Sequence, residues 1–467
     1  MRFHFVGIGG AGMSGLARVL LEMGHEVAGS DMAESLNTSR LSALGAKIFI
    51  GHSGENLLCP DFVVVSSAVP EYNEELRRAK KLRLNIMHRG DLLAALMNER
   101  YGIAVVGSHG KTTTTSMIWL ILERAGLDPT VLVGGELNDI GGNAKLGTGS
   151  FLVAEADESD GSFLKLTPAI SVVTNIDNDH LDNYGGDFER LKRAFFEFLS
   201  QARRHAVACG DDPVIRTVDK KYQSPLLYGL SDGCHVRAEQ VQLFPFGSCF
   251  QAVFPDGRSI QVRLHVPGIH NVRNALASAA VSYLLGVDPE VLKTSLPAFT
   301  GVNRRFQRLG EADGVVVVDD YAHHPTEVRA TCEAACGVGA GKLIAIFQPH
   351  RYTRTARLYR EFGPSFVGIR HLIVTRLYSA GEEPIPGISA ELIAQAVKAE
   401  SEADVRYIED QASVVEEALS LADPGDMILT IGAGNVWQIG YALLERLKQR
   451  EATCRQTGER GGEGAAQ

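Results

Sequence analysis

The sequence predicts an α/β fold divided into three domains, and three observations lead to this prediction. Its 467 residues exceed what one hydrophobic core usually organises, so about two to four domains are expected. Short apolar runs typical of buried strands alternate with helical segments, which is the rhythm of parallel sheets. Two glycine-rich loops each follow such a strand and precede a helix. We place the domains at residues 1–99, 100–298 and 299–450, before a tail at 451–467 whose composition is typical of disorder.

Composition narrows the class of protein. The chain is 45% hydrophobic and 22% charged, as is ordinary for a globular enzyme, and its net charge of -10 argues against general affinity for nucleic acid or anionic membrane. Seven cysteines without CxxC pairs indicate reduced thiols. Glycines interrupt the first apolar stretch at once, so neither a signal peptide nor a membrane span is expected. We expect a cytoplasmic protein that is a monomer or a weak homodimer.

The first domain opens with a nucleotide-binding fingerprint. The predicted strand Phe3–Val6 leads into the GxGxxG loop Gly7–Gly12, and a second strand, His25–Asp31, ends in an acidic residue where dinucleotide folds bind ribose. A dehydrogenase is one interpretation. However, the domain ends near Glu99, which leaves too little chain for both halves of a dinucleotide fold. A UDP-linked ligand, with one nucleoside and one pyrophosphate, needs less.

The rest of this domain continues the α/β alternation. We expect strands at Lys47–Ile50 and Phe62–Ser66, with helices near Glu74–Lys81 and Asp91–Asn98. This pattern predicts a Rossmann-like parallel sheet.

The central domain opens with a second phosphate-binding loop. The apolar run Ile103–Val106 precedes Gly107-Ser108-His109-Gly110-Lys111-Thr112, and a helical segment follows. In such loops backbone N–H groups face the phosphates, the lysine reaches the β and γ oxygens, and the threonine hydroxyl joins the shell of Mg²⁺. The early glycine of the usual motif is missing, since Val105 stands in its place. The sequence therefore predicts a shortened P-loop that binds a nucleoside triphosphate.

Polar residues follow the other predicted strands of the central sheet. Glu155–Asp160 comes after the strand Phe151–Ala154, and Asn175–His180 after the strand Ile170–Thr174. Ligands of open α/β sheets bind beyond the carboxyl ends of the strands, so we expect both segments beside the P-loop. Downstream, residues 234–264 indicate short antiparallel strands, with a hairpin turn at 254–257.

The third domain is predicted to hold another α/β sheet. Its expected strands are Gly314–Asp319, Lys342–Phe347, His371–Thr375 and Asp426–Thr430, with helices between them. The sequence thus predicts a second Rossmann-like domain at the carboxyl end.

Eight motifs in this order resemble those of the Mur ligase family over nearly the whole chain. They are Gly7-Ile8-Gly9-Gly10 with Gly12-Met13-Ser14, Gly107-Ser108-His109-Gly110-Lys111-Thr112, Glu155-Ala156-Asp157-Glu158-Ser159-Asp160, Thr174-Asn175-Ile176, Asp179-His180, His270-Asn271-Val272-Arg273-Asn274, Asp320-Tyr321-Ala322-His323-His324-Pro325 and Pro349-His350-Arg351-Tyr352-Thr353-Arg354. The resemblance implies domains that bind a UDP-sugar, ATP and an amino acid, in that order. It also explains the short P-loop, a form that the family shares.

The resemblance further implies that ATP drives the joining of L-alanine to the lactyl carboxylate of UDP-N-acetylmuramate through an acyl phosphate. It makes Lys111, Glu155, His180 and His323 the catalytic residues. Thr112 and Glu155 would bind one Mg²⁺, and His180 with Glu155 a second. Because a hard cation prefers oxygen ligands, Mn²⁺ is an alternative at the second site.

The implied ligand contacts form two larger sets. Those for the nucleotide are Gly107, Ser108, His109, Gly110, Lys111, Thr112, Thr113, Asn271, Asn274, Arg305 and Asp320. Those for the UDP-sugar and the amino acid are Gly9, Gly10, Gly12, Met13, Asp31, Ser66, Arg89, Tyr321, His323, His350, Arg351 and Arg354. Within the second set, the guanidinium groups of Arg351 and Arg354 suit an α-carboxylate, which each can hold through two hydrogen bonds.

Three other functions compete with this hypothesis. A ligase that attaches a ready-made peptide to the same UDP-sugar would share the first two domains, but Gly12-Met13-Ser14 favours the alanine-adding branch. An NAD-dependent oxidoreductase leaves Lys111, Glu155 and His180 unexplained. A nucleotide-switched regulatory protein needs no arginine pair after Phe347.

Overall fold

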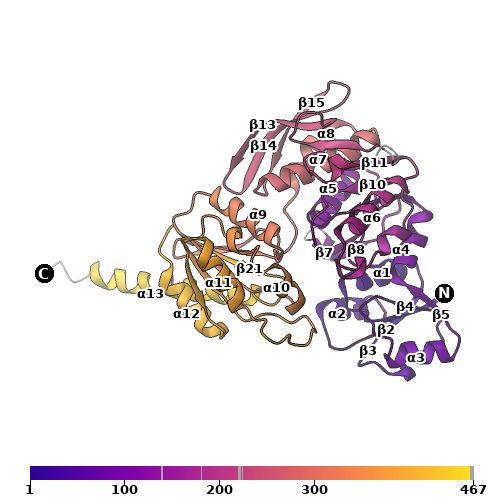
Figure 1. Ribbon diagram of the computed structural model, residues 1–467, viewed down its shortest axis with the longest axis horizontal. Helices are drawn as coiled ribbons and strands as arrows, with labels where there is room; N and C mark the ends of the chain where they lie inside the picture. The colour runs from indigo at the N-terminus through magenta and orange to yellow at the C-terminus, as the bar shows by residue number, and fades with distance from the viewer. Residues whose placement is uncertain (138–139, 180, 219–221, 223, 463–467) are drawn as a thin grey trace. The chain divides into compact units, whose positions relative to one another are not determined.

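The computed structural model describes residues 1–137, 140–179, 181–218, 222 and 224–462 (Figure 1). The chain forms two compact units. The first contains Met1–Gln242, Cys249–His265 and His270–Val302 and carries two sheets; the second contains Leu243–Ser248, Val266–Ile269 and the chain from Asn303 onward and carries a third. The predicted α/β class is confirmed in every sheet.

The first sheet has the order β3-β2-β1-β4-β5, and its strands are all parallel. The strands are β1 (Arg2–Val6), β2 (Glu26–Asp31), β3 (Lys47–Ile50), β4 (Phe62–Val65) and β5 (Asn85–His88). The helices are α1 (Ala11–Glu22), α2 (Leu36–Ala43), α3 (Glu74–Lys81) and α4 (Arg89–Asn98). The strand order reverses at β1, so the carboxyl end of β1 opens into the crevice where such sheets bind ligands. The glycine loop Gly7–Gly12 begins directly after the carboxyl end of β1.

The second sheet has ten strands in the order β15-β14-β13-β12-β11-β10-β6-β9-β7-β8. They are β6 (Tyr101–Val106), β7 (Thr130–Leu137), β8 (Gly142–Lys145), β9 (Phe151–Glu155), β10 (Ile170–Val173), β11 (His205–Cys209), β12 (Leu226–Gly229), β13 (Val236–Phe244), β14 (Gly247–Val253) and β15 (Ser259–Leu264). The helices are α5 (Lys111–Arg124), α6 (Phe188–Ser200), α7 (Ile269–Leu284) and α8 (Pro289–Ser295). β6 pairs in parallel with β9 and β10, which brings the segments after all three strands together.

Burial explains why β6 and α5 lack clear amphipathic patterns. Gly102–Val106 and Thr112–Leu122 are buried throughout, because α5 packs against both the sheet and α8. The predicted hairpin is also present. β14 and β15 are neighbours, and the Phe254 N–H donates to the Arg258 carbonyl at 2.9 Å across the turn.

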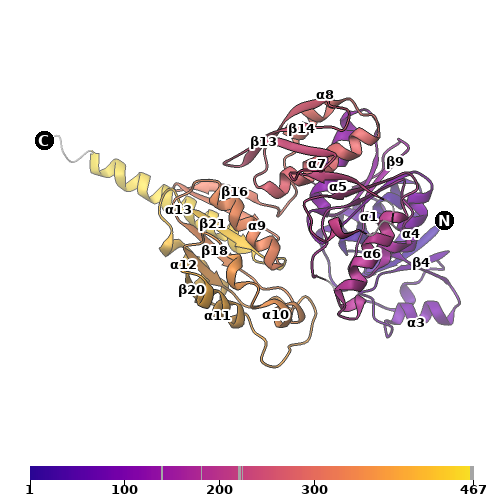
Figure 2. The same cartoon turned by 45° about the horizontal axis from the view of Figure 1, so that its top comes forward.

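The third sheet has the order β16-β17-β21-β18-β19-β20, with only β16 antiparallel to its neighbour. Four of its strands, β16, β18, β20 and β21, are labelled in Figure 2. The strands are β16 (Gln307–Ala312), β17 (Val315–Asp320), β18 (Leu343–Phe347), β19 (His371–Val374), β20 (Asp404–Tyr407) and β21 (Met427–Ile431). The helices are α9 (Pro325–Cys336), α10 (Tyr352–Leu358), α11 (Glu391–Glu400), α12 (Gln411–Leu421) and α13 (Trp437–Gly462). Alternate strand residues enter two separate cores, one against α9 to α11 and one against α12 and α13.

The carboxyl end differs from the sequence prediction. We expect an irregular tail from residue 451, whereas α13 continues through Gly462. Glutamate, arginine and glutamine around 445–456 favour helix, and the preceding buried turns of α13 supply a nucleus that these residues extend.

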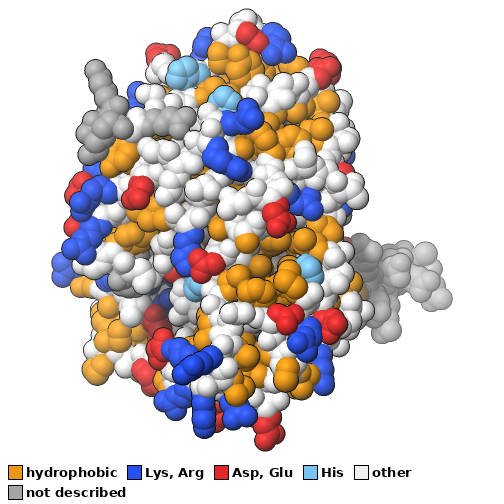
Figure 3. Space-filling model, turned by 90° about the vertical axis from the view of Figure 1, so that its right-hand side faces the viewer, with side chains coloured by type: hydrophobic (Ala, Val, Ile, Leu, Met, Phe, Trp, Pro, Cys, Tyr) orange, Lys and Arg blue, Asp and Glu red, His pale blue; other side chains and the backbone are white. Residues whose placement is uncertain are grey.

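The surface drawn in Figure 3 carries acidic and basic side chains interspersed. Within the described ranges, no helix combines the length and hydropathy that crossing a bilayer requires.

Candidate active site

The central loop can take its shape only with glycine at two positions. Gly107 has φ 143° and Gly110 has φ 78°. A Cβ on Gly107 would lie 2.0 Å from Thr174 Oγ1, and one on Gly110 would lie 2.6 Å from Asn274 Oδ1. The loop connects β6 to the first turn of α5, as predicted. Its backbone is therefore compressed against the segments that follow β10 and begin α7.

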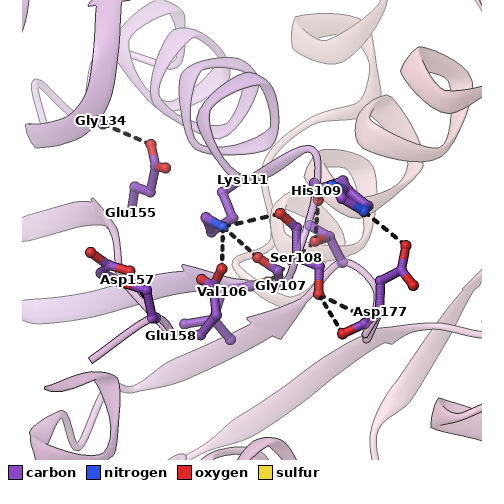
Figure 4. Close-up of polar contacts among 12 residues, drawn as sticks. Val106, Gly107, Ser108, His109, Lys111, Gly134, Glu155, Asp157, Glu158 and Asp177 are labelled. Atoms are coloured by element: carbon purple, nitrogen blue, oxygen red, sulfur yellow. Dashed lines mark hydrogen bonds and ion pairs between the residues drawn. The ribbon is translucent and has the colours of Figure 1, made fainter. Parts of the chain in front are cut away.

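Lys111 is the cation at the centre of this loop (Figure 4). Its Nζ donates to the carbonyls of Gly107 at 2.6 Å and Ser108 at 3.2 Å, and to Glu158 Oε1 at 2.8 Å. Burial lowers the pKa of Lys111, but the Glu158 and Glu155 carboxylates outweigh this effect and raise it above its usual value. Burial also raises the pKa of Glu158 to about 7, against the opposing attraction of Lys111. The lysine thus keeps its charge where a phosphate would need it.

Thr112 and Glu155 form a pair of oxygen donors beside the lysine. Thr112 Oγ1 donates to Glu155 Oε2 at 2.8 Å, and the Gly134 N–H donates to the same oxygen at 2.7 Å. A hydroxyl and a carboxylate at this separation fit a hard divalent cation. His180, the other predicted ligand, lies outside the described residues.

The predicted loop residues Ser108 and His109 are held by the segment after β10. The Asp177 N–H donates to Ser108 Oγ at 2.8 Å, and His109 Nε2 lies 3.0 Å from Asp177 Oδ2. The His109 N–H donates to Asn175 Oδ1 at 2.9 Å. These contacts fix the loop against the sheet. Sequence reasoning named this segment but did not predict the role of Asp177.

The structure places Asn271 and Asn274 against the start of α5. Thr114 Oγ1 donates to Asn274 Oδ1 at 3.2 Å, and Asn274 Nδ2 donates to Asn271 Oδ1 at 3.2 Å. Both asparagines and Thr113 are buried. They therefore lie next to the loop, and the predicted contact with adenine stays a prediction.

In the first sheet, the glycine loop is joined to Asp31. The Gly9 N–H donates to Asp31 Oδ2 at 2.8 Å, and a Cβ on Gly9 would lie 2.9 Å from the same oxygen. Gly10 caps α1, and a Cβ on Gly12 would lie 3.0 Å from Arg89 Nη1. Four of the predicted UDP-sugar residues thus surround the start of α1 together with Arg89.

Two other predicted UDP-sugar residues, Met13 and Ser66, lie on α1 and directly after β4. Met13 is 3% exposed and belongs to the core, and its side chain lies next to the loop, since a Cβ on Gly10 would lie 3.8 Å from Met13 Cγ. Ser66 directly follows β4, where its carbonyl accepts the Val69 N–H at 3.1 Å.

Arg89 links the first sheet to the acidic segment after β9. Its Nη2 donates to Asp157 Oδ2 at 2.6 Å and to Asp160 Oδ2 at 2.9 Å. Burial would raise the pKa of both carboxyls, but Arg89 and hydrogen bonds to Ser159 and Ser162 hold both below their usual range. Sequence reasoning quoted this segment without assigning site roles to Asp157, Glu158 or Asp160. The signal that could have identified them is the presence of three acidic residues directly after β9.

In the second unit, Asp320 shapes the turn after β17. Its two oxygens accept the N–H groups of Phe306 and Ala322, both at 2.7 Å. Burial raises the pKa of Asp320 to about 6, despite the attraction of Arg305. Arg305 lies 3.6 Å from Glu327 and over the Tyr321 ring. Both predicted nucleotide residues thus help to position Tyr321.

The predicted amino-acid residues gather at the carboxyl ends of β17 and β18. The ring centroids of His323 and Tyr321 are 5.5 Å apart, and those of His323 and His350 are 5.7 Å apart. Arg354 Nη1 lies 3.1 Å from His350 Nδ1. Burial, with His323 and Arg354 nearby, lowers the pKa of His350 to about 3, so its ring is neutral and accepts from Arg354. Arg351 is exposed at the start of α10.

Two glycine loops that follow parallel strands, a charged loop lysine and a Thr–Glu oxygen pair define the class of a nucleotide-dependent enzyme. Family models agree with this class. The model described as "Mur ligase family, catalytic domain" matches residues 2–101, "Mur ligase middle domain" matches 105–282, and "Mur ligase, glutamate ligase domain" matches 304–434. The chain belongs to the Mur ligase family.

Particular relatives are similar over nearly the full length. The UDP-N-acetylmuramate–L-alanine ligase of Geotalea uraniireducens is 48% identical over 453 residues, which cover 96% of this chain and 98% of the relative. The crystal structure of a UDP-N-acetylmuramate–alanine ligase from Thermotoga maritima has a TM-score of 0.83 at 30% identity, covering 96% of this chain and 100% of that one. A murein peptide ligase structure from Psychrobacter arcticus has a TM-score of 0.71 at 25% identity, covering 96% and 99%.

Proposed function

We propose that the chain joins L-alanine to the lactyl carboxylate of UDP-N-acetylmuramate while ATP is converted to ADP and phosphate. One observation carries this function. Within the first unit, the acidic segment after β9 contacts Lys111 of one anion-binding loop and Arg89 beside the other. Two phosphate-bearing substrates can therefore be held at once. The similarity to ligases named for UDP-N-acetylmuramate and L-alanine supports the choice of substrates.

The proposed reaction has two steps. A carboxylate oxygen of the sugar attacks the γ-phosphorus of ATP, the bond to ADP breaks, and an acyl phosphate forms. The amine of L-alanine then attacks the acyl carbon, phosphate leaves, and the new amide loses a proton. In the first step two anions meet, so Lys111 and the loop N–H groups must neutralise the γ-phosphate. Thr112 and Glu155 would hold Mg²⁺, which supplies further positive charge at the phosphates.

His323 is our candidate for the proton acceptor in the second step. Its Nδ1 lies 3.0 Å from the Tyr321 carbonyl oxygen, which places the N–H of the neutral ring on Nδ1. Nε2 of this tautomer carries the lone pair, which can take the proton that the amine loses as it attacks. Arg351 and Arg354 would bind the α-carboxylate of L-alanine.

The remaining assignments are proposals of the same kind. Gly9, Gly10, Gly12, Asp31 and Arg89 would bind the UDP moiety, with the loop N–H groups and the arginine on the pyrophosphate. Mn²⁺ is a candidate substitute for Mg²⁺. Peptidoglycan precursor synthesis in the cytoplasm is the proposed setting, and the domain limits 1–99, 100–298 and 299–450 stay a prediction.

The test is a reconstituted reaction. Purified protein is mixed with Mg²⁺, ATP and UDP-N-acetylmuramate and offered one L-amino acid at a time, while phosphate release and product mass are followed. We expect a product only with L-alanine or amino acids of similar size. A parallel reaction with a preformed peptide that begins with L-alanine separates this activity from peptide attachment. Absence of any L-alanine-dependent product would overturn the proposal.

A further inference from the structure

A second segment crosses the arginine-bearing segment Pro349–Arg354 in the third sheet. We call residues 376–382, which follow β19, the strap. The Tyr378 N–H donates to the Pro349 carbonyl at 2.8 Å, and the Arg351 N–H donates to the Tyr378 carbonyl at 2.8 Å. His350 and Tyr378 thereby form an isolated parallel bridge beyond the ends of β18 and β19. Two backbone bonds fix the arginine-bearing segment to the strap.

The Tyr378 side chain supports His350 from one face. The two rings are stacked with centroids 5.6 Å apart and planes at 9°. A Cβ on Gly434 would lie 2.7 Å from Tyr378 Cγ, so the absence of a side chain there makes room for the tyrosine. The stacked His350 in turn accepts from Arg354. Tyr378 therefore fixes the position of the His350 ring, whose Nδ1 atom accepts the hydrogen bond that orients Arg354.

Glu382 holds the other end of the same segment. Its carboxylate accepts the Thr353 N–H at 3.0 Å and the Thr353 hydroxyl at 2.7 Å, and Oε1 lies 3.9 Å from Arg351 Nη1. The N-cap of α10, Arg351, makes no capping hydrogen bond with its own side chain. The first turn of a helix needs acceptors for its N–H groups and favours negative charge. The Glu382 carboxylate, which belongs to the strap, supplies both an acceptor and a negative charge to the first turn of α10.

The backbone of Arg351 shows why such support is needed. Its φ is 72°, in the left-handed region that side chains other than glycine rarely adopt. A residue keeps such a conformation only where its surroundings impose it. Here the strap binds the residue's own N–H through Tyr378 and the start of the following helix through Glu382.

We propose that Tyr378 and Glu382 are positioning residues that preset Arg351 and Arg354 for the carboxylate of the amino-acid substrate. The inference rests on the proposed function of these arginines. Neither residue touches a reacting group; each acts through the segment Pro349–Arg354. Their loss should weaken binding of the amino acid and leave the two phosphate-bearing substrates unaffected. The glycine loops belong to another compact unit, and the nucleotide residues Arg305 and Asp320 contact Glu327 and the N–H groups of Phe306 and Ala322.

The main test compares substitutions at Glu382. Glu382→Ala removes the acceptor for Thr353 and should raise KM for L-alanine about tenfold, as expected from loss of a helix cap. Glu382→Gln keeps an acceptor oxygen and should stay within about threefold of the wild type. Glu383→Ala, at the exposed neighbouring carboxylate, is the matched control and should change nothing. An unchanged KM for L-alanine in Glu382→Ala, or equal rises in all three KM values, would overturn the proposal.

A substitution pair at Tyr378 tests the ring stack in the same assay. Tyr378→Phe keeps the stacked ring and should behave as the wild type, whereas Tyr378→Ala should raise KM for L-alanine about fivefold, as expected for loss of a ring pair. Equal behaviour of the two variants would remove Tyr378 from the proposal.

A second measurement does not depend on turnover. Amide hydrogen exchange at Thr353 should be about tenfold faster in Glu382→Ala than in Glu382→Gln or Glu383→Ala, because the Thr353 N–H loses its acceptor. If the wild type makes no L-alanine-dependent product, the proposed function fails, and this exchange pattern still decides whether the strap positions the segment. Exchange that is equal in all three variants rejects the strap itself.

Discussion

The two glycine loops share a strand–loop–helix plan but obtain their positive charge differently. Gly7–Gly12 follows β1 and contains no lysine; its neighbouring cation, Arg89, comes from the start of α4 and pairs with two carboxylates. The central loop carries its own cation, Lys111, which pairs with one carboxylate, Glu158. The first arrangement suits a ligand that binds without reacting at its phosphates. The second places the charge inside the loop where phosphoryl transfer requires it.

The carboxyls that pair with these two cations, Asp160 and Glu158, also differ, because their pKa values shift in opposite directions. Asp160 is 6% exposed at its side chain and Glu158 is 2% exposed, yet the pKa of Asp160 is lowered and that of Glu158 is raised to about 7. Burial acts in the same direction on both. Asp160 also accepts the Ser162 N–H at 2.9 Å and the Ser67 hydroxyl at 2.8 Å, whereas Asp157 repels a negative charge on Glu158. At Asp160 the hydrogen-bond donors and Arg89 together outweigh the effect of burial, whereas at Glu158 burial outweighs the attraction of Lys111.

The largest expected difference between the loops concerns Lys111. Lys111→Ala should lower turnover by about 10³-fold, since loss of one preorganised charge at a transferring phosphate costs roughly 4 kcal/mol. UDP-sugar affinity, measured by calorimetry, should stay within about twofold because Arg89 and the first loop are untouched. Lys145→Ala removes a lysine that pairs with Glu123 and Asp128 elsewhere in the same unit and should leave turnover unchanged. A folded Lys111→Ala protein that no longer binds the UDP-sugar would contradict the separation of the loops.

Alanine at the first glycine of each loop provides a matched pair. Gly7 has φ 79° with no heavy atom within 4 Å of an added Cβ, so Gly7→Ala should cost about 1 kcal/mol of stability. Gly107→Ala adds a clash 2.0 Å from Thr174 Oγ1 and should cost more than about 3 kcal/mol. The thermal unfolding midpoint of each variant measures the difference. Equal midpoints would show that the central loop is not compressed.

The buried carboxyl of Glu158 should make the stability of the protein depend on pH. The pKa of Glu158 is raised from 4.5 to about 7 on folding, so the native state binds more protons than the unfolded chain between these values. The contribution of Glu158 to stability should therefore fall by on the order of 3 kcal/mol as pH rises through this window and change no further above it. Glu158→Gln removes this pH-dependent contribution. The difference between the unfolding midpoint of the variant and that of the wild type should therefore change in favour of the variant from about pH 5 to about pH 8. A constant difference between the two proteins would refute the raised pKa.

The smallest expected effect lies at the first loop. Arg89→Gln should weaken UDP-sugar binding about tenfold, as expected for loss of a charge-assisted hydrogen bond to phosphate, with KM for ATP unchanged. Titration calorimetry with UDP-N-acetylmuramate measures it, and Arg77→Ala, on the exposed face of α3, is the control. If ATP binding weakened as much as UDP-sugar binding, the acidic segment would couple the loops more strongly than their separate cations indicate.

Local signals predict the glycine loops and the strands before them. The strands Ile103–Val106 and Lys342–Phe347 can be recognised because both faces of their sheets are covered, which makes the runs almost wholly apolar. The same reasoning fails for β16 and β20, whose polar, partly exposed strands at the edges of the third sheet lack that signature. The burial of Met13 could not be predicted either, because a motif position says nothing about the direction of a side chain on α1.

The strap could not be predicted for a different reason. Tyr378 meets His350 only because β19 lies beside β18, and the order of strands in a sheet is not encoded in the residues of either strand. The Lys111–Glu158 pair likewise depends on the turn after β9. The predicted roles of His180, Asn271, Asn274 and the other site residues stay predictions.

Helix α1 has a consequence for exchanging parts among related chains. Its N-terminal end carries the first glycine loop, while its flank packs against β7 and β8 of the central sheet. Asn143 Nδ2 reaches Ser14 Oγ at 2.9 Å, the Leu146 N–H reaches Glu22 at 2.8 Å, and a Cβ on Gly15 would lie 3.2 Å from Leu132. If the first domain were transplanted into a related chain, the flank of α1 would no longer fit the β7 and β8 strands of the recipient. Chimaeras joined between residues 99 and 105 should fold poorly unless β7 and β8 come from the same parent chain as α1. The segment that can be exchanged is therefore larger than the first domain.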